Sequence, residues 1–306
     1  MKSLILLIQR EFWEHRATFS ILPAVIVGAI LCVMLLGLIY APSISTDLGL
    51  QFDIQIDGDR NSEKFSFEGQ DKGTWADIIV RELQAIESDK RSNYLLIGLS
   101  SIATLFSIVV WLVALSFLLN CLFNDRRDRS VLFWKSMPVS DATTVLSKLA
   151  TALLALPLAY FCGIAILQVS WLILLSLNTS GTELSAWDTV IAPAQIFDHW
   201  LGYLVLVLFN GLWALPLWGW LLAVSAYAKS TPLVWALGVP ISLIIAEGLV
   251  SDGDRLAIWI KLHSMPLGYQ TDVVTLLFST EMVSALLVGT GFIGLAIWLR
   301  GHADEL

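Results

Sequence analysis

Six stretches of the sequence, each about twenty residues long, are almost entirely apolar. A helix of about twenty residues crosses the ~30 Å hydrocarbon core of a bilayer, because each residue advances it by about 1.5 Å. The composition agrees, since 57% of the residues are hydrophobic and only 14% are charged. We therefore predict an all-α integral membrane protein. Its six predicted spans are residues 19–40, 95–119, 149–175, 201–223, 233–250 and 282–299.

Three prolines lie within these predicted spans, at Pro157, Pro216 and Pro240. Proline has no backbone N–H, so it frees a carbonyl one turn earlier and disturbs the helix. We expect local bends at these positions.

The positions of lysine and arginine predict the orientation of the chain. With the N-terminus inside, ten of the 18 Lys and Arg residues fall in inner segments. Six others lie in the long outer loop 45–92, and only Arg255 and Lys261 lie in short outer segments. Short loops rich in Lys and Arg stay in the cytosol, whereas long loops count little. We expect a bacterial inner-membrane protein with both termini in the cytosol.

Residues 1–16, MKSLILLIQREFWEHR, predict an amphipathic helix on the inner membrane surface. Apolar residues fall on one helical face, at Leu4, Ile5, Ile8 and Phe12. The apolar run is too short for a signal peptide and is followed at once by charges. A frayed cytosolic tail is the alternative. The residues expected at the lipid–water interface are Arg10, Phe12, Trp13 and Arg16.

Residues 45–92 predict a small α+β insertion outside the membrane, between the first and second spans. In QFDIQIDGDRNSEKFSF, apolar residues alternate on both sides of a polar, glycine-containing turn, which is typical of a β-hairpin. Apolar residues from Trp75 to Ile86 then follow a helical spacing. So short a segment has little core of its own, so we expect it to pack on the membrane domain or on an extracytoplasmic partner. This divides the chain into segments 1–44, 45–92 and 93–306.

Two half-length apolar pieces, 256–262 and 273–278, precede the last predicted span. A break containing Pro266 and Gly268 separates them, and neither piece is long enough to cross a bilayer. They predict two short re-entrant helices that enter the outer leaflet and turn back. One irregular surface loop is the alternative.

The loop 124–148 contains the most unusual stretch, NDRRDRSVLFWKSMPVSD, at 124–141. Five consecutive charges precede an apolar segment, and Ser140 or Asp141 can cap the helix that follows. A short helix with an apolar face, held at the cytosolic ends of two spans, is suited to docking in a partner's groove. An interfacial loop with snorkelling arginines is the alternative. The candidate docking residues are Asp125, Arg126, Arg127, Asp128, Arg129, Leu132, Phe133, Trp134, Lys135 and Met137.

These features, taken in order, resemble the permease subunits of exporter-type ABC transporters, the ABC type 2 membrane proteins. The shared features are the amphipathic ILLIQREFWEHR helix, the charged loop between spans two and three, six spans with both ends inside, and paired short helices before the last span. The resemblance implies that residues 130–137 form the coupling helix that receives motion from an ATPase subunit. It also implies a working unit of two permeases, identical or homologous, and two ATPase subunits, with the translocation path between the permeases.

The sequence contains no G-x-x-x-x-G-K-[ST] loop, which would bind ATP phosphates. We therefore expect no catalytic activity in this chain, with ATP and magnesium bound by the partner subunit. Its three cysteines, Cys32, Cys121 and Cys162, are isolated within apolar runs, so neither a disulfide nor a metal site is expected. No nucleic-acid partner is expected.

Two other function classes stay open. A secondary transporter usually has ionisable residues at mid-membrane, and Glu247 is the one acid well inside a predicted span. A membrane enzyme with an extracytoplasmic site would have to use Asp188, Asp198 and His199, whose spacing indicates neither a nucleophile nor a metal. Polar residues in or near spans can line a path or join helices. These candidates are Asn120, Gln168, Asn210 and Glu247.

Overall fold

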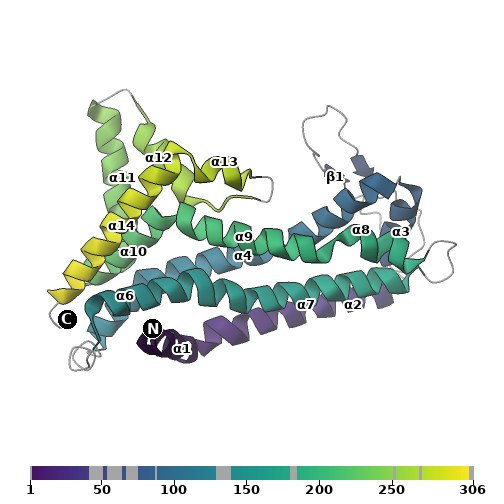
Figure 1. Ribbon diagram of the computed structural model, residues 1–306, viewed down its shortest axis with the longest axis horizontal. Coiled ribbons are helices and arrows are strands. Elements are labelled where there is room, and N and C mark those ends of the chain that lie inside the picture. Colours follow the sequence, from purple (N-terminus) through teal and green to yellow (C-terminus); the bar gives the residue numbers. More distant parts are fainter. Residues whose placement is uncertain are drawn as a thin grey trace. The chain divides into compact units, whose positions relative to one another are not determined.

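The protein is a multi-pass helical membrane protein. The computed structural model in Figure 1 describes residues 2–40, 51–53, 64–66, 75–86, 88–128, 139–179, 185–250, 253–268 and 271–302. Among these residues, six helical segments are long and apolar enough to cross a membrane. They are Ala17–Leu38, Lys90–Arg127, Asp141–Leu177, Trp187–Trp213, Pro232–Val250 and Thr280–Gly301.

The fourth predicted span, 201–223, is wrong as one continuous helix. Helix α9 (Ile196–Trp213) ends before Ala214, and α10 (Leu215–Tyr227) begins directly after it. Pro216 is the reason, because it cannot donate a hydrogen bond to the carbonyl one turn earlier, whereas in the first turn of a new helix no such donor is needed. The fourth spanning segment therefore lies further toward the N-terminus, and α10 is an additional, shorter apolar helix.

Among the described residues, three short π-helices interrupt the helical ladder. They are η1 (Ala17–Ile21), η3 (Thr151–Ala155) and η4 (Trp187–Ile191). Each ends two residues before a proline, namely Pro23, Pro157 or Pro193. Because proline has no N–H and its ring collides with the carbonyl four residues back, a wider turn gives nearby carbonyls another donor. In η1, for example, the N–H of Leu22 donates to the carbonyl of Ala17.

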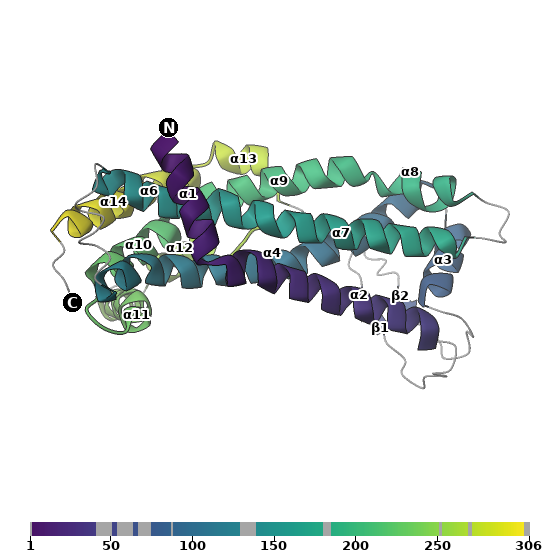
Figure 2. The ribbon, with the colours of Figure 1, turned by 90° about the horizontal axis from the view of Figure 1, so that it is seen from below.

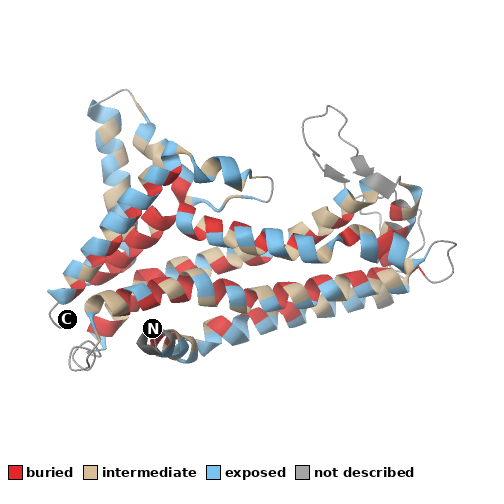
Figure 3. Cartoon of the chain, viewed as in Figure 1, coloured by how far each residue is buried: buried red, intermediate tan, exposed pale blue. Residues whose placement is uncertain are grey.

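The described helices belong to two compact units. The first consists of Met1–Pro23, Ser100–Gly163 and Asp198–Leu306. In this unit α10 and α14 (Thr280–Gly301) pack side by side with their facing sides buried (Figures 1 and 3). A Cβ atom on Gly219 would lie 2.7 Å from the carbonyl oxygen of Gly289, and one on Gly289 would lie 2.7 Å from the carbonyl carbon of Leu215. The two backbones therefore approach closely because both crossing residues are glycines.

The two short helices predicted before the last span are confirmed as α12 (Arg255–Ser264) and α13 (Val273–Leu277). Both lie in the first unit, after α11 (Pro232–Val250). Asp272 caps α13, and hydrogen bonds from Thr275 lower the pKa of its carboxyl below the ordinary value. The alternative of one irregular loop is wrong, while re-entry from the outer leaflet stays a prediction.

Polar side chains fasten α12 to its neighbours. The N–H of Leu267 donates to Oδ1 of Asn210 at 2.8 Å, and Nδ2 of Asn210 donates back to the carbonyl of Leu267 at 3.2 Å. The indole N–H of Trp213 donates to the carbonyl of Leu262 at 2.9 Å. At the other end of α12, the carboxylate of Glu247 accepts the N–H of Leu256 at 3.0 and 3.2 Å. Glu247 thus satisfies a backbone donor at the start of α12.

The second unit consists of Ala24–Leu99 and Ile164–Phe197. It contains most of α2 (Leu22–Tyr40), the start of α4 (Ser88–Arg127), the end of α7 (Leu156–Leu177), α3 (Trp75–Ala85) and α8 (Ala192–Ala194). Ala76, Val80 and Leu83 on one face of α3 are buried in a cluster with leucines of α4 and α7. The Arg91 guanidinium donates to the carbonyl of Leu83 at 2.6 Å and so caps the end of α3.

Two three-residue strands lie in the predicted insertion. β1 (Gln51–Asp53) pairs antiparallel with β2 (Lys64–Ser66), with Phe52 opposite Phe65. The turn predicted between them, at 54–63, lies outside the described residues. The extracytoplasmic position of the insertion and the division into 1–44, 45–92 and 93–306 stay predictions.

Candidate functional site

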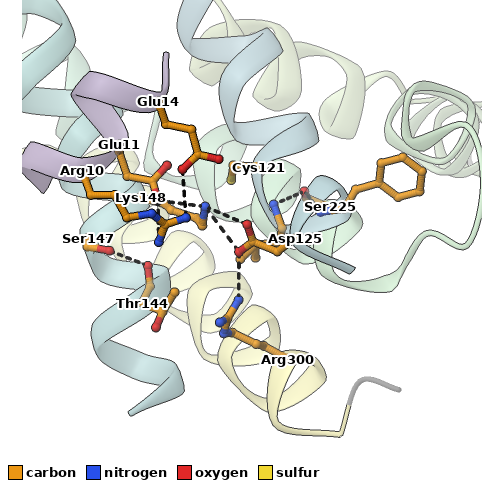
Figure 4. A network of polar contacts seen from close by, with 12 residues as sticks. Arg10, Glu11, Glu14, Cys121, Asp125, Thr144, Ser147, Lys148, Ser225 and Arg300 are labelled. Atoms are coloured by element: carbon orange, nitrogen blue, oxygen red, sulfur yellow. Dashed lines mark hydrogen bonds and ion pairs between the residues drawn. The ribbon is translucent and has the colours of Figure 1, made fainter. Parts of the chain in front are cut away.

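Four charged side chains from four helices meet inside the first unit. They are Glu11 of α1 (Lys2–Glu14), Asp125 of α4, Lys148 of α6 (Asp141–Ala150) and Arg300 of α14. Each side chain is at most 8% exposed. Charged residues are almost never buried this far unless they are paired. We refer to these four residues as the charge cluster (Figure 4).

Asp125 is the centre of the charge cluster. Its carboxylate lies 3.4 Å from Nζ of Lys148 and 3.3 Å from Nη1 of Arg300. Lys148 also donates to Oε1 of Glu11 at 3.1 Å. Two carboxylates and two cations therefore balance, and each depends on the others because an unpaired buried ion costs several kcal/mol.

The start of α6 joins the charge cluster from its edge. The hydroxyl of Ser140 accepts the N–H of Thr143 at 3.2 Å, so Ser140, one of the two predicted caps, caps this helix. The cap places Asp141 at the first helical position, where its carboxylate accepts a hydrogen bond from Nε of Arg300 at 3.1 Å. Arg300 therefore joins the last turn of α4 to the first turn of α6. Those two turns flank the segment 129–138.

Helix α1 contributes the N-terminal side of the site. It packs against α6 and η3, and Figure 2 shows it crossing them. Within residues 6–14 of this helix, Leu7 and Glu11 are buried, and neither was singled out from the sequence. Arg10 pairs with Glu14 at 2.9 Å beside Glu11. Of the other predicted interfacial residues, Phe12 packs on Phe19 with ring centres 5.6 Å apart, while Trp13 and Arg16 are exposed. Contact with the membrane surface stays a prediction.

Arg126 has a separate role beside the charge cluster. Its Nη2 donates to the carbonyls of Ser225 and Ala228, at 3.1 and 2.5 Å. These groups lie at the end of α10, where carbonyls lack helical partners. The Ser225 hydroxyl in turn accepts the N–H of Leu122 at 3.0 Å. The end of α4 is therefore attached both to the charge cluster and to the turn between α10 and α11.

The predicted docking residues divide into three groups. Asp125 and Arg126 are buried and bind within the chain. Arg127 and Asp128 are exposed and pair with each other at 3.1 Å. The remaining six lie outside the described residues, namely Arg129, Leu132, Phe133, Trp134, Lys135 and Met137. Contact of this segment with a partner stays a prediction.

Three of the four candidate polar residues join parts of the chain. Gln168 donates to the carbonyl of Leu99 at 2.8 Å inside the second unit. Asn210 bonds to Leu267, which follows α12, and Glu247 bonds to Leu256 at the start of α12. Asn120 donates to the carbonyl of Ser116 at 2.8 Å in its own helix. Asn120 also lines two cavities of the first unit, of about 520 and about 1200 Å³.

The residues considered for an enzyme have ordinary structural environments. Asp188 accepts a hydrogen bond from Ser185 at 2.5 Å at the start of its own helix. His199 is buried, and Asp198 lies in the first turn of α9. Within the part of the chain that the structure describes, no group of three or more His, Cys, Asp or Glu side chains is placed to hold a metal ion.

Comparisons of the chain with protein-family models, with curated proteins and with solved structures gave no match. What the protein does has to be inferred from its membrane helices and its charge cluster. The cluster joins four helices through buried ion pairs.

Proposed function

We propose that this chain is the permease subunit of an ATP-driven exporter of the ABC type 2 kind. In this proposal the six spanning segments form the membrane domain, and the segment 129–138 contains the coupling helix. One observation carries the proposal: the two helix ends that flank this segment both bind Arg300 of the charge cluster, through Asp125 and Asp141. A force on the segment would therefore act directly on α1 and α14 as well.

The charge cluster makes this transmission rigid. Asp125 and Asp141 share Arg300, and Asp125 also shares Lys148 with Glu11. Removing one partner of a buried ion pair costs about 3–5 kcal/mol, because the other charge is left without compensation. Moving the end of α4 alone is thus unfavourable, and the attached helices would move with it.

The rest of the assembly follows from the same proposal. Both termini and the segment 129–138 face the cytosol of a bacterium, and the insertion at 45–92 lies outside. α12 and α13 enter the membrane from the outer side. Two ATPase subunits bind ATP and magnesium, and a second permease, identical or homologous, completes the translocation path. The charge cluster, the six spanning segments and the paired short helices support this arrangement.

The test removes the aromatic side chains of the coupling segment. Burial of Phe133 and Trp134 in a partner's groove would contribute roughly 1.5–3 kcal/mol each. The tagged chain is purified from its source cells, and co-purifying subunits and ATP hydrolysis in lipid are measured. We expect Phe133→Ala with Trp134→Ala to lose the ATPase subunit, or to retain it without coupling. The matched control is Phe197→Ala with Phe278→Ala, since both side chains are more than three-quarters exposed in the structure, at 77% and 84%.

Two outcomes would contradict the proposal. One is ATP hydrolysis by the purified chain alone. The other is a double variant that assembles and couples like the parent, which would make the segment an interfacial loop. The secondary-transporter alternative has less support, because Glu247 is engaged in capping α12.

A further inference from the structure

The larger cavity of the first unit has an unusual lining. Its volume is about 1200 Å³, and its walls come from α4, α10, α11, α12 and α14. Among the described residues that line it, none is Asp, Glu, Lys or Arg. A charged ligand would leave its charge uncompensated there, so the lining favours an apolar molecule.

The cavity is elongated along α11. Its lining residues on this helix run from Pro232 to Ile244, a length of about 18 Å at 1.5 Å per residue. One leaflet of a bilayer provides about 15 Å of hydrocarbon, half of the ~30 Å core. The length of the cavity therefore matches the hydrocarbon chain of a single leaflet.

One end of the cavity is polar and lies near the end of α4. Ser116 and Asn120 line it from α4, and Thr231 lines it from the turn before α11. The hydrogen bond from Leu122 to Ser225 fixes this level of α4 beside the end of α10. Lys229 is exposed in the same turn. Polar groups and a cation at this end suit the ester and phosphate of a lipid.

The other end is formed mainly by Trp259 and Ile260, together with His263 and Ser264. Phe292 lies along the wall between the two ends, because it packs on Trp220, whose indole N–H donates to the carbonyl of Ala236 at 3.1 Å. The His263 ring is buried, and it stacks on Trp213 with ring centres 4.8 Å apart. Its Nδ1 bonds to the carbonyl of Trp259 at 2.9 Å. Apart from His263 and Ser264, this end is lined by Leu256, Trp259 and Ile260, whose apolar and aromatic side chains suit the end of a hydrocarbon chain.

The helix that forms the long wall is poorly covered by the rest of the protein. Only 6% of the residues in the most apolar part of α11 are buried inside the protein, the lowest share among the six spanning segments (Figure 3). Exposed apolar side chains of a spanning helix face lipid, so the bilayer is the source from which a ligand reaches this cavity. We infer that the cavity binds one acyl chain of a membrane glycerophospholipid, with the ester end at Asn120 and Thr231 and the chain end at Trp259 and Ile260. This goes beyond the proposed function and needs no ATPase subunit.

The test uses the purified chain in detergent with phosphatidylcholine probes that carry a photoreactive diazirine on one acyl chain. A diazirine near the chain end should label peptides of α12 and α14, and one near the ester should label peptides around Asn120 and Thr231. Unlabelled phosphatidylcholine should compete for both. Labelling of the exposed α2 serves as the reference for lipid that only surrounds the protein, and should not saturate.

A matched pair of variants tests the position of the site. Ile241 lines the cavity and is 52% exposed, whereas Ile245 on the same helix is 58% exposed and is not in its lining. Ile241→Trp should fill the groove and reduce saturable labelling roughly tenfold, while Ile245→Trp should leave it unchanged. Leu237→Trp, at a second exposed lining position, should repeat the loss if Ile241→Trp is poorly folded.

Three results would overturn the inference. The first is labelling that neither saturates nor exceeds that of α2. The second is equal labelling of the Ile241→Trp and Ile245→Trp variants. The third is saturable labelling by a diazirine-bearing free fatty acid with none by the phospholipid probes, which would assign the cavity to a different ligand.

Discussion

Lys148 of α6 and Glu11 of α1 lie 137 residues apart in the chain and form an ion pair with 3.1 Å between Nζ and Oε1. Each side chain is only 2% exposed. This pair attaches the N-terminal helix to the helix that follows the segment 129–138. Helix α1, a short amphipathic helix, is therefore held in the first unit by this ion pair.

The first prediction concerns the charge of Lys148. Lys148→Met should lower the free energy of unfolding by about 3–5 kcal/mol, because the carboxylates of Glu11 and Asp125 lose a buried partner. Thermal unfolding in detergent measures the loss. Lys229→Met, at an exposed lysine, should change stability by no more than about 0.5 kcal/mol.

A second substitution separates charge from packing. Adding Glu11→Gln to Lys148→Met removes one of the two carboxylates that lost their partner. The double variant should therefore be more stable than Lys148→Met alone. Equal stabilities of Lys148→Met and Lys229→Met would mean that the charge cluster does not hold these helices together.

The second prediction concerns the crossing of α10 and α14. Gly289→Ala places a methyl group 2.7 Å from the carbonyl carbon of Leu215, which is backbone and cannot move aside. We expect a loss of about 1–3 kcal/mol from overpacking. Gly291→Ala in the same helix meets nothing within 4 Å and should be neutral or stabilising by up to about 1 kcal/mol. Matched stabilities of the two variants would rule out the close crossing.

The third prediction concerns the end of α3. Arg91→Met removes the donors to the carbonyls of Leu83 and Gln84, which lie at 2.6 and 3.4 Å. Hydrogen bonds from a charged group contribute about 1.5–3 kcal/mol, so the free energy of local opening of α3 should fall by about this amount. Hydrogen exchange of the α3 amides should become faster accordingly. Arg91→Lys keeps the charge without the planar guanidinium, so its α3 amides should exchange at a rate between those of the parent chain and of Arg91→Met. Unchanged exchange in Arg91→Met would show that α3 is held by its apolar face alone.

The fourth prediction concerns orientation. A cysteine at Ser62, in the insertion, should react with an impermeant thiol reagent in intact cells, and one at Ser136 should not. The parent chain, with its three cysteines, gives the background. The opposite pattern would reverse the orientation and remove the basis for a cytosolic coupling segment.

Hydropathy along the chain predicted five of the six spanning helices. Five of the six predicted spans lie within or nearly within the helical segments of the structure, because an apolar run of membrane length has few alternatives to a helix. Local chemistry also limited the cap to Ser140 or Asp141, of which Ser140 is the cap, and predicted the two short helices around Pro266 and Gly268. The break at Ala214 was missed, because Pro216 is compatible with either a kink or a new helix.

Only the tertiary structure showed which charged residues pair in the charge cluster. Glu11, Lys148 and Arg300 were not recognised as parts of one site, and Asp125 was assigned to a partner. Lys148, a single lysine within the apolar sequence VLSKLATALL, indicated a buried charge, but the sequence does not show which acidic residue pairs with it. Likewise, the sequence did not give the partners of Gln168, Asn210 and Glu247, which are visible only as hydrogen bonds in the fold. Hydropathy sums over neighbours along the chain, whereas the pairing of buried charges depends on which helix ends the fold brings together.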